Sequence, residues 1–185
     1  FEQAIGILKS HQEKQEEESQ EGADDELQYD NTNAQCSVAP DTNCSPSMSA
    51  TEYVKYSMDY VTPTNQTVVA EASLYEDIGS MYVSMQKRPW QSDPSIFGCS
   101  DKFQEPGYYL SVSPTLESSM MCATSVGDCD DKANAFGSLL IASGLFAEDE
   151  VRTALGTVQF GSKPSDIGGH AWTEVYLAEE KHWIP

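Results

Sequence analysis

The sequence predicts an α+β domain, and three observations lead to this fold class. Apolar residues recur at helical spacing from Cys129 to Gly144. The segment from His170 to Leu177 alternates between two sets of side chains, as a strand with two different faces does. The helix precedes the strands without further alternation, an order typical of α+β proteins. We therefore expect a helix beginning at a cysteine, followed in the chain by the strands of an antiparallel sheet.

The length and composition indicate one ordinary domain with a peripheral extension. The chain has 185 residues and 39% hydrophobic content, which suffices for one core. Ten of its thirty acidic residues fall within the first thirty positions. Residues 1–49 are therefore predicted to form an acidic N-terminal extension, partly helical or disordered, that serves as a spacer rather than an interaction tail. Residues 50–185 are predicted to form the folded domain.

Two helices and a long connection are expected before Cys129. Aromatic and apolar residues at 53–60 predict a short helix that ends before Pro63. Apolar side chains at steps of three and four predict a further helix over 65–87, ended by Pro89. Residues 90–126 carry several prolines and glycines and read as a long irregular connection, a kind of segment that is often functional.

The helix that begins at Cys129 has recognisable signals at both ends. Asp128 is a good N-cap residue, and Asp131 lies three positions further on, as in an acidic capping box. Gly144 is a plausible C-terminal cap. The apolar stripe between these ends comprises Cys129, Ala133, Phe136 and Leu140.

Strands are expected over the rest of the chain. Val151 to Phe160 is rich in β-branched and apolar residues, and a turn at 179–181 leads into a short strand at 182–184. The strand between them, 170–177, divides into two faces. One face carries His170, Trp172, Glu174 and Tyr176, and the other carries Ala171, Thr173, Val175 and Leu177.

The five cysteines allow two disulfides and one free thiol. Cys36 and Cys44 flank one short loop, and Cys99 and Cys122 bracket a second loop region, so Cys36–Cys44 and Cys99–Cys122 are the preferred pairs. This pairing leaves Cys129 free. Five reduced thiols in a cytoplasmic protein remain an alternative, because spacing alone does not determine connectivity.

The net charge excludes some classes of binding partner. The net charge of −20 repels phosphate backbones and anionic lipid surfaces, so neither nucleic acid nor a membrane surface is expected as a partner. The longest nearly apolar stretch is too short to span a bilayer, although a tether upstream of Phe1 stays open. The candidate disulfides and two Asn-x-Ser/Thr triplets, at Asn43 and Asn65, favour an extracytoplasmic location, either secreted or anchored at the cell surface.

Cys129 and His170 are the candidate catalytic pair. Backbone N–H groups at a helix N-terminus favour a thiolate and could also receive an oxyanion, and a histidine beside the thiol would take its proton. The acidic residues Asp128, Asp130 and Asp131 oppose the thiolate, so they are expected to point to solvent or to cap the backbone. The scattered His, Cys and Asp residues lack the spacing of zinc ligands, and neither a metal ion nor a cofactor is expected.

Three ordered segments carry a resemblance to a known family. The strings GDCDDKA at 127–133, GHAWTEVY at 169–176 and HWIP at 182–185 resemble the transglutaminase-like superfamily over about residues 114–185. The resemblance implies a papain-like arrangement, in which a Cys-bearing helix packs against an antiparallel sheet and the site works by acyl transfer through a thioester. It identifies Cys129 as the nucleophile and His170 as its base.

The resemblance also bears on the residues around this pair. It places the third catalytic residue, an orienting acid, just after Pro185. It treats Glu174 as structural, and Trp172 and Asp128 are candidate walls of the site.

The sequence as a whole therefore predicts a thiol-dependent hydrolase or acyltransferase. It would act on peptide or side-chain amide bonds, as a cysteine peptidase, an amidase or a transglutaminase-type acyltransferase, with a protein or peptide as its substrate. The alternatives are a catalytically inactive transglutaminase-like module used for binding or assembly in an extracellular protein, and a purely structural extracellular domain stabilised by disulfides.

Overall fold

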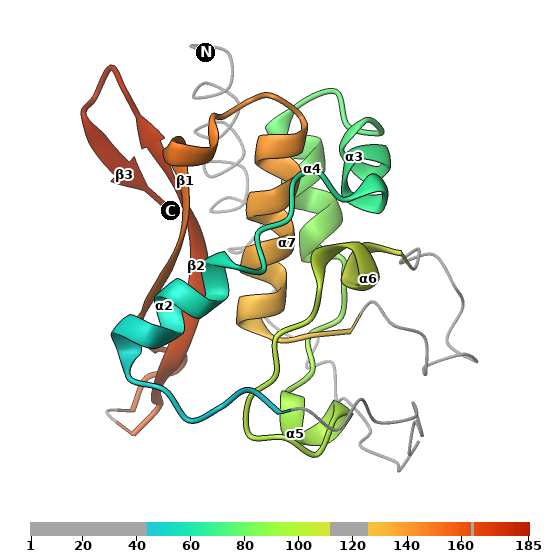
Figure 1. The fold of residues 1–185 in the computed structure, drawn as a ribbon. Coiled ribbons are helices and arrows are strands. Elements are labelled where there is room, and N and C mark those ends of the chain that lie inside the picture. Colours follow the sequence, from blue (N-terminus) through green and yellow to red (C-terminus); the bar gives the residue numbers. More distant parts are fainter. Residues whose placement is uncertain (1–43, 112–125, 164) are drawn as a thin grey trace, which may run out of the picture.

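The computed structural model describes residues 44–111, 126–163 and 165–185. The elements surround one long helix, α7, which starts at Cys129 (Figure 1). In chain order they are α2 (Ala50–Met58), α3 (Gln66–Ala72), α4 (Ile78–Gln86), α5 (Asp93–Ile96), α6 (Pro106–Leu110), α7 (Cys129–Ala142), the 3₁₀ helix η1 (Glu148–Glu150), β1 (Val151–Gln159), β2 (Ile167–Leu177) and β3 (His182–Ile184).

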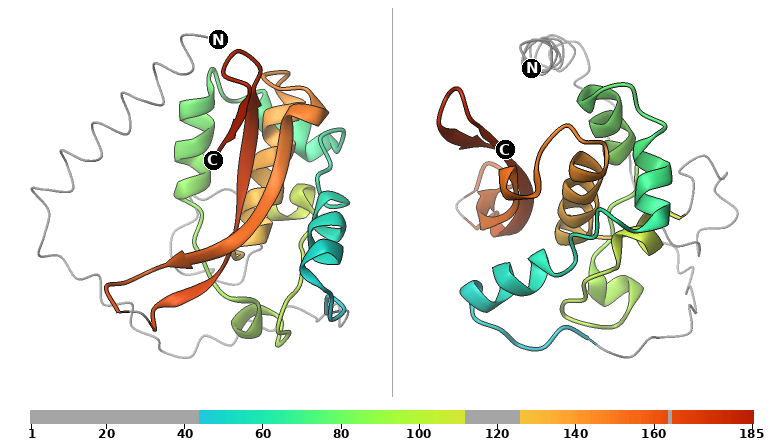
Figure 2. Two further views of the ribbon diagram at one scale, coloured as in Figure 1. Left: turned by 90° about the vertical axis from the view of Figure 1, so that its left-hand side faces the viewer. Right: turned by 45° about the horizontal axis from the view of Figure 1, so that its top comes forward.

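The three strands form an antiparallel sheet in the order β1-β2-β3. In this register Leu155 of β1 lies opposite Ala171 of β2, and Gly156 lies opposite His170. Figure 2 shows the β1–β2 hairpin as a long, strongly twisted ribbon whose tip extends beyond the helices. The α+β class and the antiparallel sheet predicted from the sequence are both confirmed.

Helix α7 lies between the sheet on one side and helices α3, α4 and α6 on the other (Figures 1 and 2). The face of β2 that carries Ala171, Val175 and Leu177 is buried against α7. Thr173 on the same face donates a hydrogen bond from Oγ1 to the Ala133 carbonyl, at 2.8 Å. The core comprises Val68, Ala72, Ile78, Met81, Met85, Tyr109, Leu110, Ala135, Leu139, Leu140, Phe146, Val151, Val175 and Leu177.

Both predicted ends of α7 are confirmed, but the capping box is wrong. Asp128 is the N-cap residue, and Gly144 follows the C-terminus with a φ of 74°, where its N–H donates to the Ile141 carbonyl. The Asp128 side chain accepts no capping hydrogen bond. Asp131 turns away from the helix because a better pair of donors, the backbone and side-chain N–H groups of Gln104, lies beside it.

The single helix expected over 65–87 is two helices, α3 and α4. Ser73 ends α3, and its hydroxyl donates to the Ala70 carbonyl at 2.7 Å. Asp77 then begins α4, because its carboxylate accepts from the Ser80 backbone N–H at 2.7 Å in a capping box. The apolar periodicity runs through both helices, so it did not reveal the turn between them.

The predicted disulfide pairs are wrong. Cys44 is bonded to Cys99, so neither Cys36–Cys44 nor Cys99–Cys122 forms. Cys36 and Cys122 lie outside the described residues. The free cysteine of the described part is Cys129, as expected.

The physical reason for the Cys44–Cys99 bond is that the segments after the two cysteines run side by side. The Ser45 backbone N–H donates to the Asp101 carbonyl at 2.9 Å, and the Phe103 N–H donates to Ser45 Oγ at 3.3 Å. Tyr53 of α2 packs its ring against Phe103, with ring centroids 4.9 Å apart. These contacts bring the start of α2 onto the 99–104 segment, which lies far away in the sequence.

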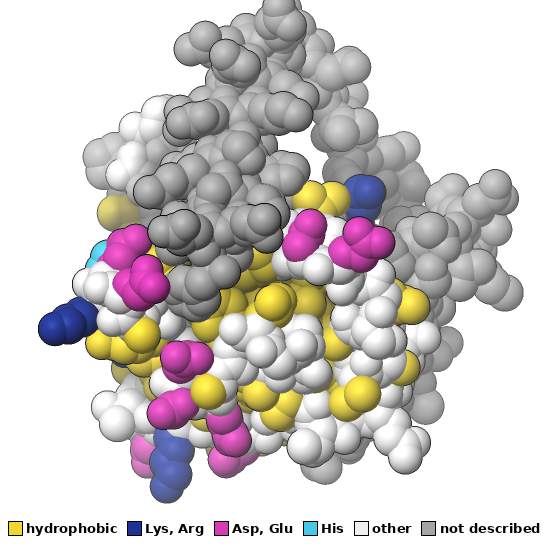
Figure 3. All heavy atoms as spheres, turned by 90° about the horizontal axis from the view of Figure 1, so that it is seen from above, with side chains coloured by type: hydrophobic (Ala, Val, Ile, Leu, Met, Phe, Trp, Pro, Cys, Tyr) yellow, Lys and Arg dark blue, Asp and Glu magenta, His cyan; other side chains and the backbone are white. Residues whose placement is uncertain are grey.

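The surface reflects the acidic composition. Figure 3 shows acidic side chains spread over the face seen from above, with single basic side chains at its margin. None of the helices in the described ranges is long and apolar enough to cross a bilayer. Most of the predicted acidic extension, residues 1–43, lies outside the described part of the chain, so that prediction stays untested.

Candidate active site

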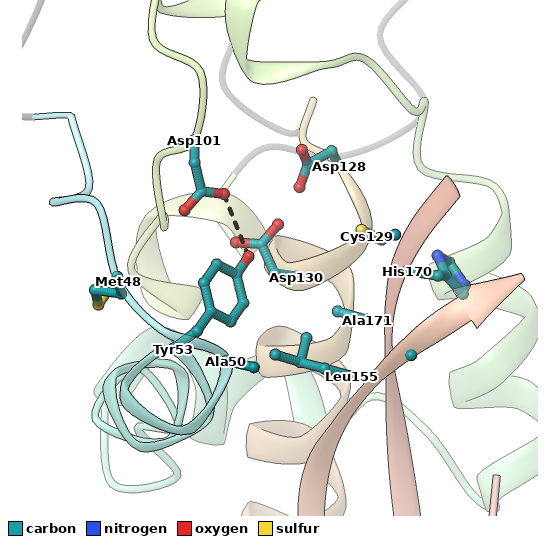
Figure 4. Close-up of a pocket in the computed structure, with 12 residues that line it drawn as sticks. Met48, Ala50, Tyr53, Asp101, Asp128, Cys129, Asp130, Leu155, His170 and Ala171 are labelled. Carbon is teal, nitrogen blue, oxygen red and sulfur yellow. Dashed lines mark hydrogen bonds between the residues drawn. The ribbon is translucent and has the colours of Figure 1, made fainter. Parts of the chain in front are cut away.

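Cys129 lies on the wall of a pocket of about 390 Å³, at the point where α7 approaches β2 (Figure 4). The start of α2, the first turn of α7 and the middle of the β1–β2 hairpin surround this pocket. Its lining comprises Met48, Ala50, Tyr53, Asp101, Asp128, Cys129, Asp130, Leu155, Gly156, Gly169, His170 and Ala171. The fold therefore brings the two residues of the candidate catalytic pair into one pocket, although 40 positions separate them in the sequence.

His170 is held between two aromatic side chains. Its ring is stacked on Trp172 with centroids 6.1 Å apart, and it forms a T-shaped pair with Phe160 with centroids 5.9 Å apart. Figure 4 shows His170 on the strand beside the start of α7. No hydrogen bond joins its ring to the Cys129 thiol in the described part of the chain. The catalytic pairing of these two side chains stays a prediction.

The Cys129 thiol has two opposing influences on its charge. Burial raises the pKa of the thiol above its usual value, and the Asp128 carboxylate raises it further. The backbone N–H groups of Ala171, Cys129 and Asp130 act in the other direction because they face the sulfur and favour its anion. Burial has the largest effect, so Cys129 in this structure is a neutral thiol with anion-stabilising donors in place around it.

The acids next to Cys129 do not point to solvent, contrary to expectation. Asp130 and Asp131 each expose 1% of their surface. Burial is the main cause that raises the pKa of both carboxyl groups well above the ordinary range, and neighbouring carboxylates add to it. Gly127 allows this close packing, because a Cβ at that position would collide with the side chains of Asp131 and Gln104.

Among the pocket residues not recognised as site residues from the sequence, Tyr53 and Asp101 are polar and lie far from Cys129 in the chain. Tyr53 projects from α2 and donates a hydrogen bond from its hydroxyl to Asp101 Oδ1 at 3.2 Å, as Figure 4 shows. Burial is the main cause that raises the pKa of both groups. Tyr53 was assigned to a short helix and Asp101 to an irregular connection, and no local motif links either residue to Cys129. They reach the pocket of Cys129 through the tertiary fold, in which the Cys44–Cys99 disulfide joins the two segments that carry them.

The other candidate site residues have structural contacts. Glu174 accepts hydrogen bonds from Trp172 Nε1 at 3.1 Å and from Arg152 Nε at 2.7 Å, so it holds the outer face of the hairpin rather than the His170 ring. Asp128 lines the pocket, whereas Trp172 lies behind His170 and outside the lining. The expected orienting acid beyond Pro185 stays a prediction.

Comparison with known proteins supports the resemblance for the C-terminal part of the chain. Residues 98–185 match the family model described as the transglutaminase-like superfamily. These residues form a transglutaminase-like core. The match includes Cys129, His170, helix α7 and the whole sheet, so the resemblance seen in the sequence is confirmed.

One curated relative of the transglutaminase-like core is a peptide-N(4)-(N-acetyl-beta-glucosaminyl)asparagine amidase from Caenorhabditis briggsae. It is 33% identical over 87 residues, which are 47% of this chain and 11% of the relative. The chain thus spans about a tenth of that protein's length. No solved structure matches the chain. Together the family model and this relative support a thiol-dependent amidase or transglutaminase-like family for this chain.

Proposed function

We propose that the transglutaminase-like core cleaves amide bonds through a thioester formed on Cys129. The observation that carries the proposal is the position of this thiol. It begins α7, lines a pocket together with His170, and is faced by three backbone N–H groups. Such donors stabilise negative charge on sulfur, or on a tetrahedral intermediate formed beside it.

The reaction assigns one role to each group. Sγ of Cys129 attacks the amide carbonyl carbon while its proton passes to the His170 ring, and a C–S bond forms. His170 then returns the proton to the leaving nitrogen as the C–N bond breaks. Water, or an amine in a transamidation, attacks the thioester and restores the thiol. A neutral resting thiol suits this order of steps, because the base removes the proton from sulfur only as the attack begins.

The pocket and the relative guide the choice of substrate. Tyr53, Asp101 and Asp128 give one wall acidic and hydrogen-bond-accepting character, which favours neutral amides or cationic groups over carboxylates. The C. briggsae relative is named as an amidase of a glycosylated asparagine side chain. We therefore place side-chain amides of a protein or peptide first among candidate substrates and backbone peptide bonds second.

One observation favours a second function, an inactive binding or assembly module. The pKa of Cys129 is raised by burial, and no hydrogen bond connects the thiol with His170 in the described residues. A module that has lost catalysis would keep this state when substrate binds. The substrate assay and the trapping experiment described below separate the two functions.

The test uses fluorogenic side-chain amide and peptide substrates with the full chain and matched variants. We expect Cys129→Ala to abolish turnover and His170→Gln to lower it by about 10²–10⁴-fold. His182→Gln is the control, because His182 is an exposed residue on β3 and does not line the pocket. Activity that survives in Cys129→Ala would contradict the proposal.

A trapping experiment distinguishes an unsuitable substrate from an inactive module. A chloroacetamide or vinyl-sulfone peptide should modify Cys129 in the wild type, and intact mass should show one adduct. The His170→Gln variant should react more slowly, because the proton acceptor is lost. Equal rates in the two proteins, together with no turnover of any substrate, would support the inactive module.

A further inference from the structure

The strand β1 is an edge of the three-stranded sheet, because the strand order is β1-β2-β3. In an antiparallel pair, every second residue turns its backbone N–H and C=O toward the partner strand, and the residues between them turn these groups outward. Just after β1, the Phe160 N–H donates to the Asp166 carbonyl at 2.8 Å, across the hairpin. The Thr153 N–H instead donates away from the sheet, to Met58 Sδ of α2 at 3.5 Å. The odd-numbered residues of β1 therefore face the free edge.

Three odd-numbered residues follow Thr153 along this edge, namely Leu155, Thr157 and Gln159. Within the described ranges, they take part in no backbone hydrogen bond outside the β1–β2 pairing. Thr157 and Gln159 are exposed, and Figure 2 shows the end of the hairpin extending beyond the helices. A row of free backbone groups at the edge of a sheet is a template for one more strand.

This edge lacks the usual protection against such pairing. Soluble proteins commonly place charged side chains or proline on an exposed edge strand. Residues 155–159 read LGTVQ, with neither a charge nor a proline, in a chain of which 22% of the residues are charged. Two apolar side chains follow near the tip of the hairpin, where Phe160 is 67% exposed and Ile167 is 56% exposed. An uncharged edge beside exposed apolar side chains indicates that another chain binds here.

The same edge leads to the candidate nucleophile. Leu155 lines the pocket together with Cys129 and His170, as Figure 4 shows. It also lies opposite Ala171, whose backbone N–H faces the Cys129 sulfur. A polypeptide that runs along β1 from the hairpin tip toward Leu155 therefore arrives at the pocket of the thiol.

We propose that an extended segment of a protein substrate binds as an additional strand along residues 155–159 of β1, and that this pairing leads it into the pocket of Cys129. This mode of binding rests on the proposed function, since it states how the substrate of that thiol is held. Binding through backbone groups tolerates many side-chain sequences but requires an extended chain without a partner strand. The net charge of −20 favours a neutral or basic segment over an acidic one. The substrate is therefore an unfolded or loop segment of a protein, with the reacting amide close to the paired residues.

Binding is tested with the full chain carrying Cys129→Ala, so that no turnover occurs. The ligand is a fluorescein-labelled peptide of about nine residues, with a central glutamine among threonines and valines and a lysine at each end. Two matched peptides carry N-methyl groups on alternate amides, one at the even and the other at the odd positions. We expect one of the two to bind like the parent and the other about tenfold more weakly, because only every second amide faces β1. Equal affinities of the two, or no saturable binding of the parent up to about 1 mM, would overturn the proposal.

Substitutions in β1, made in the same Cys129→Ala protein, locate the binding edge. Thr157→Pro removes an outward N–H and no hydrogen bond to β2, and proline is tolerated at such positions of edge strands. We expect this variant to bind the parent peptide about tenfold more weakly, whereas Thr157→Val keeps the N–H and should not change the affinity. Circular dichroism confirms folding, and Gln159→Pro, at the end of β1, is the second variant if Thr157→Pro does not fold. Unchanged affinity in a folded proline variant would count against pairing at this edge.

These measurements separate strand pairing from amide cleavage. Alternating effects of N-methylation, together with no turnover of any substrate by the wild type, would support the pairing and contradict cleavage at Cys129. Turnover of small amides without the alternation would contradict the pairing alone. A second copy of this chain is the other candidate for the edge. A dimer in analytical ultracentrifugation that Thr157→Pro dissociates would assign the edge to that copy and overturn the proposal.

Discussion

Cys129 combines a raised pKa with a set of donors that stabilise its anion. Burial keeps the proton on sulfur, and Asp128 adds to this, while the N–H groups of Ala171, Cys129 and Asp130 lower the cost of losing the proton. With these opposing effects, the Cys129 thiol stays protonated before the reaction. It becomes reactive when a base removes the proton during attack, which is the role assigned to His170.

This balance predicts the pH dependence of alkylation. A raised pKa means that the proton is kept to higher pH, and only the thiolate reacts with iodoacetamide. The labelling rate of Cys129 in the folded protein should therefore rise about tenfold per pH unit, with a midpoint above the ordinary thiol value of roughly 8.5. Stopped-flow or mass-spectrometric rates in EDTA measure it. Fast, pH-independent labelling at pH 6–7 would instead indicate a preformed thiolate–imidazolium pair.

Gly156 leaves the space that the Trp172 indole occupies next to His170. A Cβ there would lie 2.6 Å from Cη2 of Trp172, so the indole, which stacks on His170, would have to move. We expect Gly156→Ala to lower the free energy of unfolding by about 1–3 kcal/mol and to shift tryptophan fluorescence. Gly169→Ala is the matched control, because no atom lies within 4 Å of its added Cβ. Equal urea midpoints for the two variants would contradict this steric account.

Among the elements, α7 carries the candidate nucleophile and contacts both elements that form the rest of the pocket. Its N-terminus presents Cys129, and its middle is fixed to α2 and β1 by one buried polar side chain. Asn134 Oδ1 accepts hydrogen bonds from Ser57 Oγ at 2.8 Å and from Thr153 Oγ1 at 2.9 Å. These contacts set the distance between α2, which carries Tyr53, and the hairpin, which carries His170.

We expect Asn134→Ala to destabilise the protein by about 2–4 kcal/mol. The substitution leaves the buried Ser57 and Thr153 hydroxyls without their acceptor and opens a small cavity. The Ser57→Ala variant removes one donor, and a double-mutant cycle with Asn134→Ala should show a coupling energy of about 0.5–3 kcal/mol in urea unfolding. Strictly additive effects would mean that the hydrogen bond does not connect the two helices energetically.

For the whole molecule, the Cys44–Cys99 disulfide determines where the N-terminal part of the domain lies. It closes a loop with a sequence separation of 55 residues, and the pocket residues Met48 and Tyr53 follow Cys44 closely along the chain. A disulfide is compatible with the extracytoplasmic location expected from the sequence. Its main physical effect is to restrict the unfolded chain.

Removing this disulfide tests that effect. For a loop of this length the chain-entropy estimate is about 4 kcal/mol, and measured losses are commonly about 2–4 kcal/mol. We expect the double variant Cys44→Ser/Cys99→Ser to lose stability in this range, measured by urea unfolding with the m-value fitted for each protein, because opening the loop makes the unfolded chain less compact. Cys129→Ser is the control, because this free thiol closes no loop. An unchanged midpoint in the double variant would show that the bond does not constrain the unfolded ensemble.

The sequence by itself determined the elements around the reaction centre. The helix start at Cys129, its glycine end and the two-faced strand of His170 were all predicted, and the transglutaminase-like core was recognised from three short strings. These features are local, because capping and side-chain periodicity act over a few neighbouring residues. The break between α3 and α4 was missed for the same reason, since one apolar stripe continues across it.

The tertiary structure alone decided the partners of these residues. It paired Cys44 with Cys99, buried Asp130 and Asp131, and brought Asp93 close to Asp128 and Asp131. It also placed the Tyr53–Asp101 contact opposite Cys129. Each of these facts depends on where segments distant in the sequence come to lie, and burial then sets the charge state of the carboxyls. The spacing of residues within one segment does not predict these contacts, because the contacts are set by the packing of the whole chain.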